Sequence, residues 1–247
     1  MHKEVPVVLV NGLIGHLDHP ALRDRLAPRS VITPSMLGYG HLSTVSPDRI
    51  DIPAQVEHLR QVLEESAPGD RVHLLGHSVG AVVAMLYACR YPSTVASVIN
   101  VEGNFSLRDA FWSSAVAQMS AEEVQSMLAG FRTDVAGWLA GAGIAATSRT
   151  METAASWLEY QPASTLQAMA RSVLLETGAD SYFSELRSLF STTPVHLVAG
   201  ERSREGWDVP GWAMEHAAST TIMPGVGHLM MLEAPQEFVQ VILRIVE

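Results

Sequence analysis

The chain has 247 residues, 47% hydrophobic and 17% charged, which excludes a disordered protein and suits one large domain or a domain carrying an insertion. Its 16 basic and 26 acidic residues give a net charge of −10, which disfavours nucleic acid or an anionic membrane as the main partner. The single cysteine, Cys89, excludes an intrachain disulfide. The apolar runs are too short for a signal peptide or a membrane span, so we expect a cytoplasmic protein.

The first half of the chain alternates between strand and helix patterns. Four β-branched, apolar runs predict buried strands: Val5–Val10, Val31–Thr33, Val72–Leu75 and Val95–Val101. Segments with helical spacing of apolar residues lie between them: about His19–Leu26, Ile52–Glu65 and Val79–Arg90. This order predicts a mostly parallel, doubly wound α/β sheet with helices on both faces.

The alternation stops after the fourth strand. Between about Phe105 and Phe190 only helical segments are predicted: Leu107–Met119, Ala121–Phe131, Ala154–Tyr160, Ser164–Glu176 and Tyr182–Leu189. Strand patterns resume at Pro194–Gly200 and Ser219–Met223, and a last helix covers Pro235–Val246. We therefore expect a core formed by residues 1–104 and 191–247, interrupted by a helical cap at 105–190.

One serine lies where a strand pattern changes to a helix pattern. The pentapeptide Gly76-His77-Ser78-Val79-Gly80 fits G-x-S-x-G, and a sharp turn at this place needs glycines because a Cβ would crowd the neighbouring backbone. Such a turn exposes the serine hydroxyl, and the helix N-terminus behind it favours developing negative charge. The context predicts that Ser78 is a catalytic nucleophile.

Four segments together resemble the α/β-hydrolase superfamily: "LVNGLIG", "PSMLGYGHLS", "GHSVG" and "GVGHLMMLEAP". The predicted insertion falls where this superfamily carries its helical cap. The resemblance implies that His228 is the general base and that the backbone N–H groups of Leu13 and Val79 form an oxyanion hole. Many members have His-Gly before the first of these donors, whereas this chain has Asn11-Gly12.

The carboxylate that would orient the histidine is not evident from the sequence. The superfamily's commonest acid would stand at position 203, which is a serine here. Asp208 and Glu201 lie nearby in a loop that could present either of them. We favour Glu102, which directly follows an apolar strand, because a carboxylate there would be costly to bury without a partner.

The sequence predicts a serine hydrolase that cleaves a carboxylic ester, thioester or lactone through an acyl-enzyme. Carbon–carbon bond hydrolysis, a lyase step, cofactor-free oxygen chemistry on the same site, or a ligand-binding protein on this fold are the alternatives. We expect a small-molecule substrate with an apolar or acyl portion, and neither a cofactor nor a metal. Candidate substrate-binding residues are Asn11, Gly12, Ile14, His77, Trp112 and Met230. The sequence does not indicate the oligomeric state.

Overall fold

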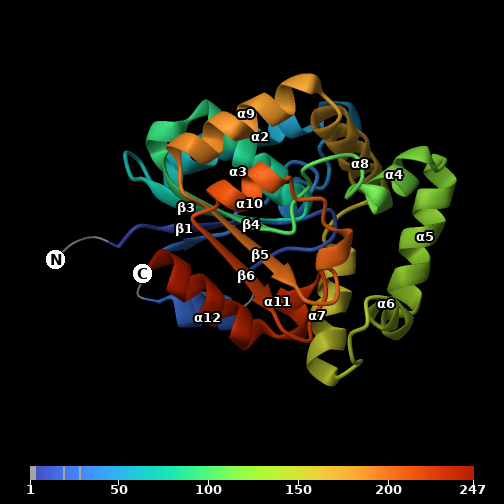
Figure 1. Ribbon diagram of the computed structural model, residues 1–247. Helices are drawn as coiled ribbons and strands as arrows, with labels where there is room; N and C mark the ends of the chain where they lie inside the picture. The colour runs from blue at the N-terminus through green and yellow to red at the C-terminus, as the bar shows by residue number, and fades with distance from the viewer. Residues whose placement is uncertain (1–3, 19, 28) are drawn as a thin grey trace.

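The computed structural model describes residues 4–18, 20–27 and 29–247. Its six strands form one sheet in the order β2-β1-β3-β4-β5-β6, and every neighbouring pair is parallel (Figure 1). The strands are β1 (Val7–Val10), β2 (Val31–Ile32), β3 (Val72–His77), β4 (Val95–Val101), β5 (Val195–Gly200) and β6 (Ser219–Met223).

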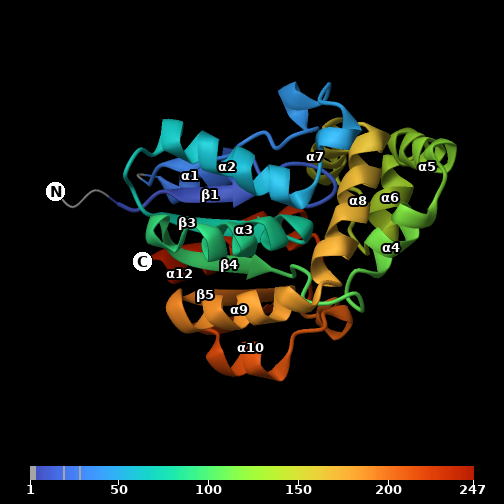
Figure 2. The same ribbon diagram turned by 90° about the horizontal axis from the view of Figure 1, so that it is seen from above.

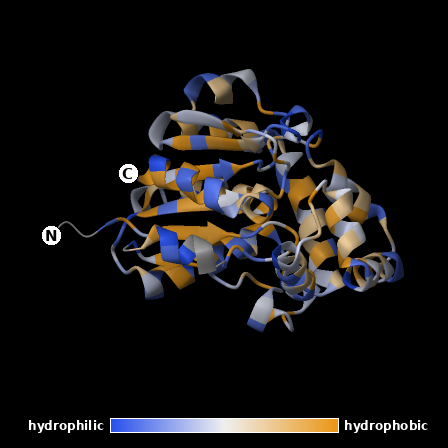
Figure 3. Cartoon of the chain, turned by 90° about the horizontal axis from the view of Figure 1, so that it is seen from below, coloured by the Kyte–Doolittle hydropathy of each residue, from blue (hydrophilic) through white to orange (hydrophobic). Residues whose placement is uncertain are grey.

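The central strands are mostly apolar on both faces because both faces are covered, whereas the edge strands β2 and β6 are only partly buried. In β1, Val8 and Val10 belong to one hydrophobic cluster, while Val7 and Leu9 belong to another on the opposite side. This alternation follows from the two-residue period of a strand. Figure 3 shows the resulting apolar strands between helices whose polar faces point outward.

Two helical layers enclose the sheet, as Figures 1 and 2 show. One layer contains α2 (Ile52–Ser66), α3 (Val79–Arg90), α9 (Asp180–Thr192) and α10 (Gly211–His216). The other contains α1 (Pro20–Leu26) and α12 (Pro235–Val246), with the short α11 (Met230–Glu233) before the latter. Four 3-10 turns complete the connections: Gly40–Leu42, Pro47–Arg49, Pro92–Thr94 and Arg204–Gly206.

The inserted helices lie beyond the carboxyl ends of the strands (Figure 2). They are α4 (Phe111–Gln118), α5 (Ala121–Thr133), α6 (Val135–Gly141), α7 (Ser148–Glu159) and α8 (Ala163–Thr177). Because open α/β sheets bind ligands at the carboxyl ends of their strands, these helices cover the edge where a site is expected. The next helix, α9, returns to pack against α3 and α10 beside the sheet.

The predicted α/β fold with a doubly wound parallel sheet is confirmed. The six predicted strands are all present, with ends shifted by a few residues. The sequence analysis missed α6, α10 and α11, which have only seven, six and four residues. Segments this short contain too few periods of apolar residues to show a helical pattern. Of the predicted helix at His19–Leu26, His19 lies outside the described residues.

Candidate active site

Ser78 occupies a strained turn between β3 and α3. Its backbone has φ 53° and ψ −128°. Among the described residues, Ser78 and Glu102, with φ 45°, are the two non-glycine residues with positive φ. Backbone strain of this kind persists only where the surroundings enforce it, and it is concentrated at functional sites. The two strained residues directly follow β3 and β4, so the carboxyl ends of these two strands form the candidate site.

The two glycines of the pentapeptide are required by close backbone contacts. A Cβ on Gly76 would collide with the backbone of Ala81 on the first turn of α3. A Cβ on Gly80 would collide with the carbonyl oxygens of Val10 and Asn11 at the end of β1. Because neither neighbour is a flexible side chain, neither position can hold any other residue without moving the turn.

Ser78 opens into a pocket of about 250 Å³, which we call the Ser78 pocket. It lies between the strand ends and the first inserted helices. Its apolar walls are Leu13, Phe111, Trp112 and Trp207, and its polar lining includes Ser78, Glu102, Asn104, Asp109, Ser113, Ser203 and His228. Phe111 is 69% exposed, so this aromatic ring stands at the mouth of the pocket.

His228 is joined to Glu102 on the pocket wall. The ring Nδ1 lies 2.6 Å from Glu102 Oε2, while the side chain of His228 is 43% exposed. Because a carboxylate only accepts hydrogen bonds, Nδ1 donates, and in the neutral ring Nε2 is then left without a proton. The pair thus presents a proton acceptor in the same pocket as the Ser78 hydroxyl.

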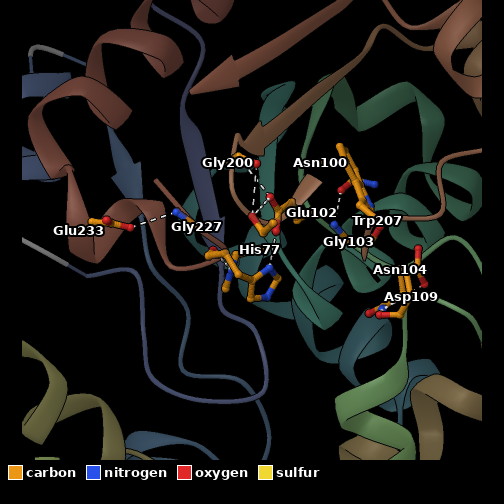
Figure 4. Close-up of polar contacts among 12 residues, drawn as sticks. His77, Asn100, Glu102, Gly103, Asn104, Asp109, Gly200, Trp207, Gly227 and Glu233 are labelled. Carbon is orange, nitrogen blue, oxygen red and sulfur yellow. Dashed lines mark hydrogen bonds and ion pairs between the residues drawn. The ribbon is translucent and has the colours of Figure 1, made fainter. Parts of the chain in front are cut away.

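Glu102 is held as an acceptor from three directions. The residue is 5% exposed, and its Oε1 accepts from the backbone N–H of Gly200 at 2.7 Å and from Ser203 Oγ at 2.5 Å (Figure 4). The turn after it is fixed because Gly103 donates its N–H to Asn100 Oδ1 at 2.6 Å. Together with His228, these donors satisfy a carboxylate that would otherwise be costly to bury.

The other two carboxylates that the sequence left open have different partners. Asp208 Oδ2 accepts from Ser106 Oγ at 2.7 Å, and Glu201 Oε2 accepts from the Gly225 N–H at 2.8 Å. Of the three candidates, Glu102 is the carboxylate that contacts His228. Ser203, at the position of the superfamily's usual acid, instead donates to Glu102.

The backbone of the loop that carries His228 is held by two hydrogen bonds, one at Gly227 and one at His228 itself. The Gly227 N–H donates to Glu233 Oε2 at 3.0 Å, and His77 Nε2 donates to the His228 carbonyl at 3.0 Å. Burial, together with the nearby His228, lowers the pKa of His77 well below its usual value, so its ring is neutral. His77 is buried and does not line the Ser78 pocket, which corrects its assignment to substrate binding.

Asn11 orients the peptide that follows it. Its Nδ2 donates to the Gly12 carbonyl at 2.9 Å. In a trans peptide the N–H points opposite to the carbonyl, so this bond directs the Leu13 N–H away from Asn11. Among the described residues, neither this N–H nor that of Val79 has a protein acceptor, so both are candidate donors to a ligand oxygen. Leu13 lines the pocket, and Val79 directly follows Ser78.

The remaining predicted contact residues are divided between site and core. A Cβ on Gly12 would lie 3.1 Å from that of Ser78, so glycine permits the loop's close approach. Trp112 lines the pocket as expected. Ile14 packs between the two hydrophobic clusters, and Met230 is 0% exposed inside one of them. Met230 is thus a core residue, whereas Ile14 is half-buried against both clusters, and neither lines the Ser78 pocket.

The described residues do not meet the requirements of a metal site, a membrane-spanning helix or a reactive cysteine. No three His, Cys, Asp or Glu side chains in the described ranges are arranged to hold a metal ion. Every helix in these ranges is too short or too polar to cross a bilayer. Burial raises the pKa of the Cys89 thiol to about 12, as expected of an unreactive cysteine.

The chain is similar in sequence or in fold to several known proteins. "Lipase 3" of Moraxella sp. (strain TA144) is 27% identical over 112 residues, which are 45% of this chain and 34% of that protein. The match thus spans about a third of this curated relative's length. The chain is similar in fold to an esterase from Thermogutta terrifontis, with TM-score 0.71, 21% identity, and coverage of 99% and 91% of the two chains. It is also similar to MenH from S. aureus, with TM-score 0.76, 16% identity, and coverage of 100% and 94%.

The family is established over nearly the whole chain. The match to "Alpha/beta hydrolase family" covers residues 7–241, from the first strand of the sheet to the last helix. This range includes the strained serine, the histidine and the glutamate described above. The chain therefore belongs to the alpha/beta hydrolase family.

Proposed function

We propose that this protein is a serine hydrolase that cleaves a carboxylic ester, thioester or lactone through an acyl-enzyme on Ser78. The main support is that Ser78, on a strained turn at a helix N-terminus, shares one pocket with a histidine whose Nδ1 lies 2.6 Å from a buried carboxylate. This is the relation of nucleophile, base and orienting acid that acyl transfer requires. The similarity to a lipase and an esterase is in keeping with it.

In the proposed reaction, Ser78 Oγ bonds to the substrate carbonyl carbon while its proton passes to Nε2 of His228. The Leu13 and Val79 N–H groups donate to the oxyanion, a contribution of about 3–4 kcal/mol for preorganised donors of this type. Glu102 stabilises the imidazolium. His228 then protonates the leaving oxygen or sulfur as its bond to the acyl carbon breaks, which leaves an acyl-enzyme.

Water completes the cycle. His228 removes a proton from the water as its oxygen bonds to the acyl carbon, and it returns that proton to Ser78 Oγ when the acid departs. Each turnover thus consumes one water and regenerates the free serine. No step requires a cofactor.

The pocket lining favours an uncharged substrate with an apolar portion. Three aromatic rings and Leu13 supply most of the apolar wall. The described lining includes Glu102 and Asp109 but no Lys or Arg, so an anionic substrate would meet like charge without a counter-ion.

A fluorophosphonate probe tests the proposal directly. We expect the probe to label the protein on Ser78, and Ser78→Ala to abolish both labelling and hydrolysis of p-nitrophenyl acetate. Ser113→Ala is the matched control, because Ser113 lines the same pocket, and this variant should keep the label. Labelling without turnover of any ester, thioester or lactone would point to another reaction of the same nucleophile. Absence of both would overturn the proposal.

A further inference from the structure

The Ser78 pocket is small for the substrates of this fold. Its volume of about 250 Å³ is below the range of roughly 300–1,000 Å³ that is usual for small-molecule sites. A larger ester must therefore extend beyond it. A second hollow of about 560 Å³ also has Trp112 in its lining, so this residue borders both spaces.

This second hollow, which we call the aromatic annex, has a mostly apolar lining, with one carboxylate, Asp134, whose Oδ1 accepts from the Gly137 N–H at 2.8 Å. Its aromatic walls are Trp112 of α4, Phe131 of α5 and Trp138 of α6, and Leu229 adds an aliphatic side. The rings of Phe131 and Trp138 lie 6.5 Å apart between centroids and are tilted by 48°. Half-buried aromatic rings around a hollow suit an apolar, preferably flat, ligand group.

Two exposed helical glycines line the annex. No atom lies within 4 Å of a Cβ built on Gly130 or on Gly141, although both line the hollow. Neither glycine has a positive φ, so the backbone does not require glycine there. Glycine is among the least favourable residues inside a helix, so both positions cost helix stability, and a larger side chain at either one has room beside the annex.

The position of Leu229 indicates which part of a substrate would reach the annex. Leu229 directly follows His228 and lines the annex, whereas His228 lines the Ser78 pocket. In the proposed mechanism His228 delivers a proton to the leaving oxygen or sulfur, so the leaving group must lie beside this ring. The oxyanion donors at Leu13 and Val79 would hold the opposite side of the reacting carbonyl.

We propose that the aromatic annex binds the apolar leaving group, an aromatic or alkyl alcohol or thiol, of the substrate that Ser78 attacks. This inference rests on the proposed function. In this arrangement the substrate contacts Trp112, its carbonyl group lies in the Ser78 pocket, and its alcohol portion lies in the annex. The enzyme would accordingly select its substrates by the alcohol that they release.

The test compares two acetates that form the same acetyl-enzyme, so that the ratio of their kcat/KM values reports only on the leaving group. We expect 2-phenylethyl acetate to exceed methyl acetate about tenfold in the unmodified protein, because the annex buries the ring. Gly130→Leu and Gly141→Leu should each remove most of this preference. Gly211→Leu, at another helical glycine with open space but outside both hollows, should keep the preference.

A second pair of esters, which differ in the acyl chain, shows which part of the inference has failed. If Gly130→Leu changes the ratio between ethyl octanoate and ethyl butyrate instead, the annex holds the acyl chain and the assignment to the leaving group is wrong. If an active enzyme shows no change in either ratio, the annex is not a substrate site, while the proposed function still stands.

Binding provides a readout that does not depend on turnover. In Ser78→Ala, 2-phenylethanol should quench tryptophan fluorescence through Trp112 and Trp138, and adding Gly130→Leu should weaken its Kd about fivefold or more. Equal affinity in the two variants would overturn the inference even if no ester were hydrolysed. Failure of every ester, thioester and lactone in the presence of this binding would overturn the proposed function alone.

Discussion

The two sides of the Ser78 pocket are built by different kinds of interaction. On the sheet side, the buried Glu102 has defined polar partners in Gly200, Ser203 and His228, and a Cβ on Gly80 would strike backbone oxygens. On the side of the inserted helices, Phe111 and Trp112 line the pocket, and in the adjoining annex Gly130 faces no neighbour. The contrast suggests that the sheet side determines the chemistry and tolerates little change, whereas the helical side determines which substrate fits and tolerates more.

The largest effect should come from removing the charge next to His228. Glu102→Gln keeps the shape of the side chain but loses the carboxylate that holds the histidine tautomer, so we expect kcat for p-nitrophenyl acetate to fall about 10³–10⁴-fold. Asp208→Asn is the control, because Asp208 contacts Ser106 and not the histidine. Near-normal turnover of the Glu102 variant, with a large loss in the Asp208 variant, would reassign the acid.

Two glycine substitutions compare the sides directly in terms of stability. Gly80→Ala places a methyl group against the Val10 and Asn11 carbonyls, and we expect about 1–3 kcal/mol of destabilisation from overpacking. Gly130→Ala enters open space within α5 and should stabilise the protein by up to about 1 kcal/mol. Urea unfolding followed by circular dichroism measures both, and equal effects of the same sign would contradict the comparison.

Asn11→Leu tests whether the sheet side of the pocket needs a well-oriented Leu13 N–H group. Losing the bond from Nδ2 to the Gly12 carbonyl releases the peptide that carries the Leu13 N–H. Removing an oxyanion donor outright costs about 10²–10³ in kcat, so a donor that is present but less well oriented should cost about tenfold. KM for p-nitrophenyl acetate should change little. A rise in KM with unchanged kcat would mean that Asn11 contacts the substrate rather than orienting the donor.

The smallest effect is a pH dependence of stability centred on His77. Its pKa in the folded protein is well below the value of about 6.5 expected when unfolded, so below pH 6.5 the unfolded chain binds more protons than the folded one. Stability is therefore full above this pH and falls as the pH is lowered, by at most about 1.4 kcal/mol per pH unit for one histidine.

Replacing this histidine isolates its contribution. His77→Gln keeps a donor for the His228 carbonyl but cannot titrate, so its loss of stability between pH 7.5 and pH 5.5 should be smaller than in the parent protein. His41→Gln, at an exposed position, should retain the parent slope. Urea titrations at several pH values measure this, and identical slopes in the parent and His77→Gln would show that His77 does not carry the effect.

Much of the core was predictable because its signals are local. The strands appear as short apolar runs, since each is buried on both faces, and their alternation with helices implies a parallel sheet. The pentapeptide around Ser78 carries its own steric reason, because Gly76 and Gly80 are needed wherever a strand turns sharply into a helix. The assignment of His228 came from the resemblance of its loop to the α/β-hydrolase superfamily, and its role as the base stays a prediction.

Other features were decided only by the tertiary structure, because they depend on groups distant in the chain. Which carboxylate meets His228 follows from the pairing of β4 with β5, which brings the Gly200 N–H and Ser203 to Glu102. Burial of Met230 and the backbone contact of His77 likewise depend on how the last loop packs against the sheet.

By itself, therefore, the sequence determined the layered α/β fold and the strand-to-helix turn that carries Ser78. These follow from residue periodicity and from sterics within a few neighbouring residues. The identity of the carboxylate at His228 and the hollow beside Trp112 arise from side chains that become neighbours only when separate strands and helices pack together.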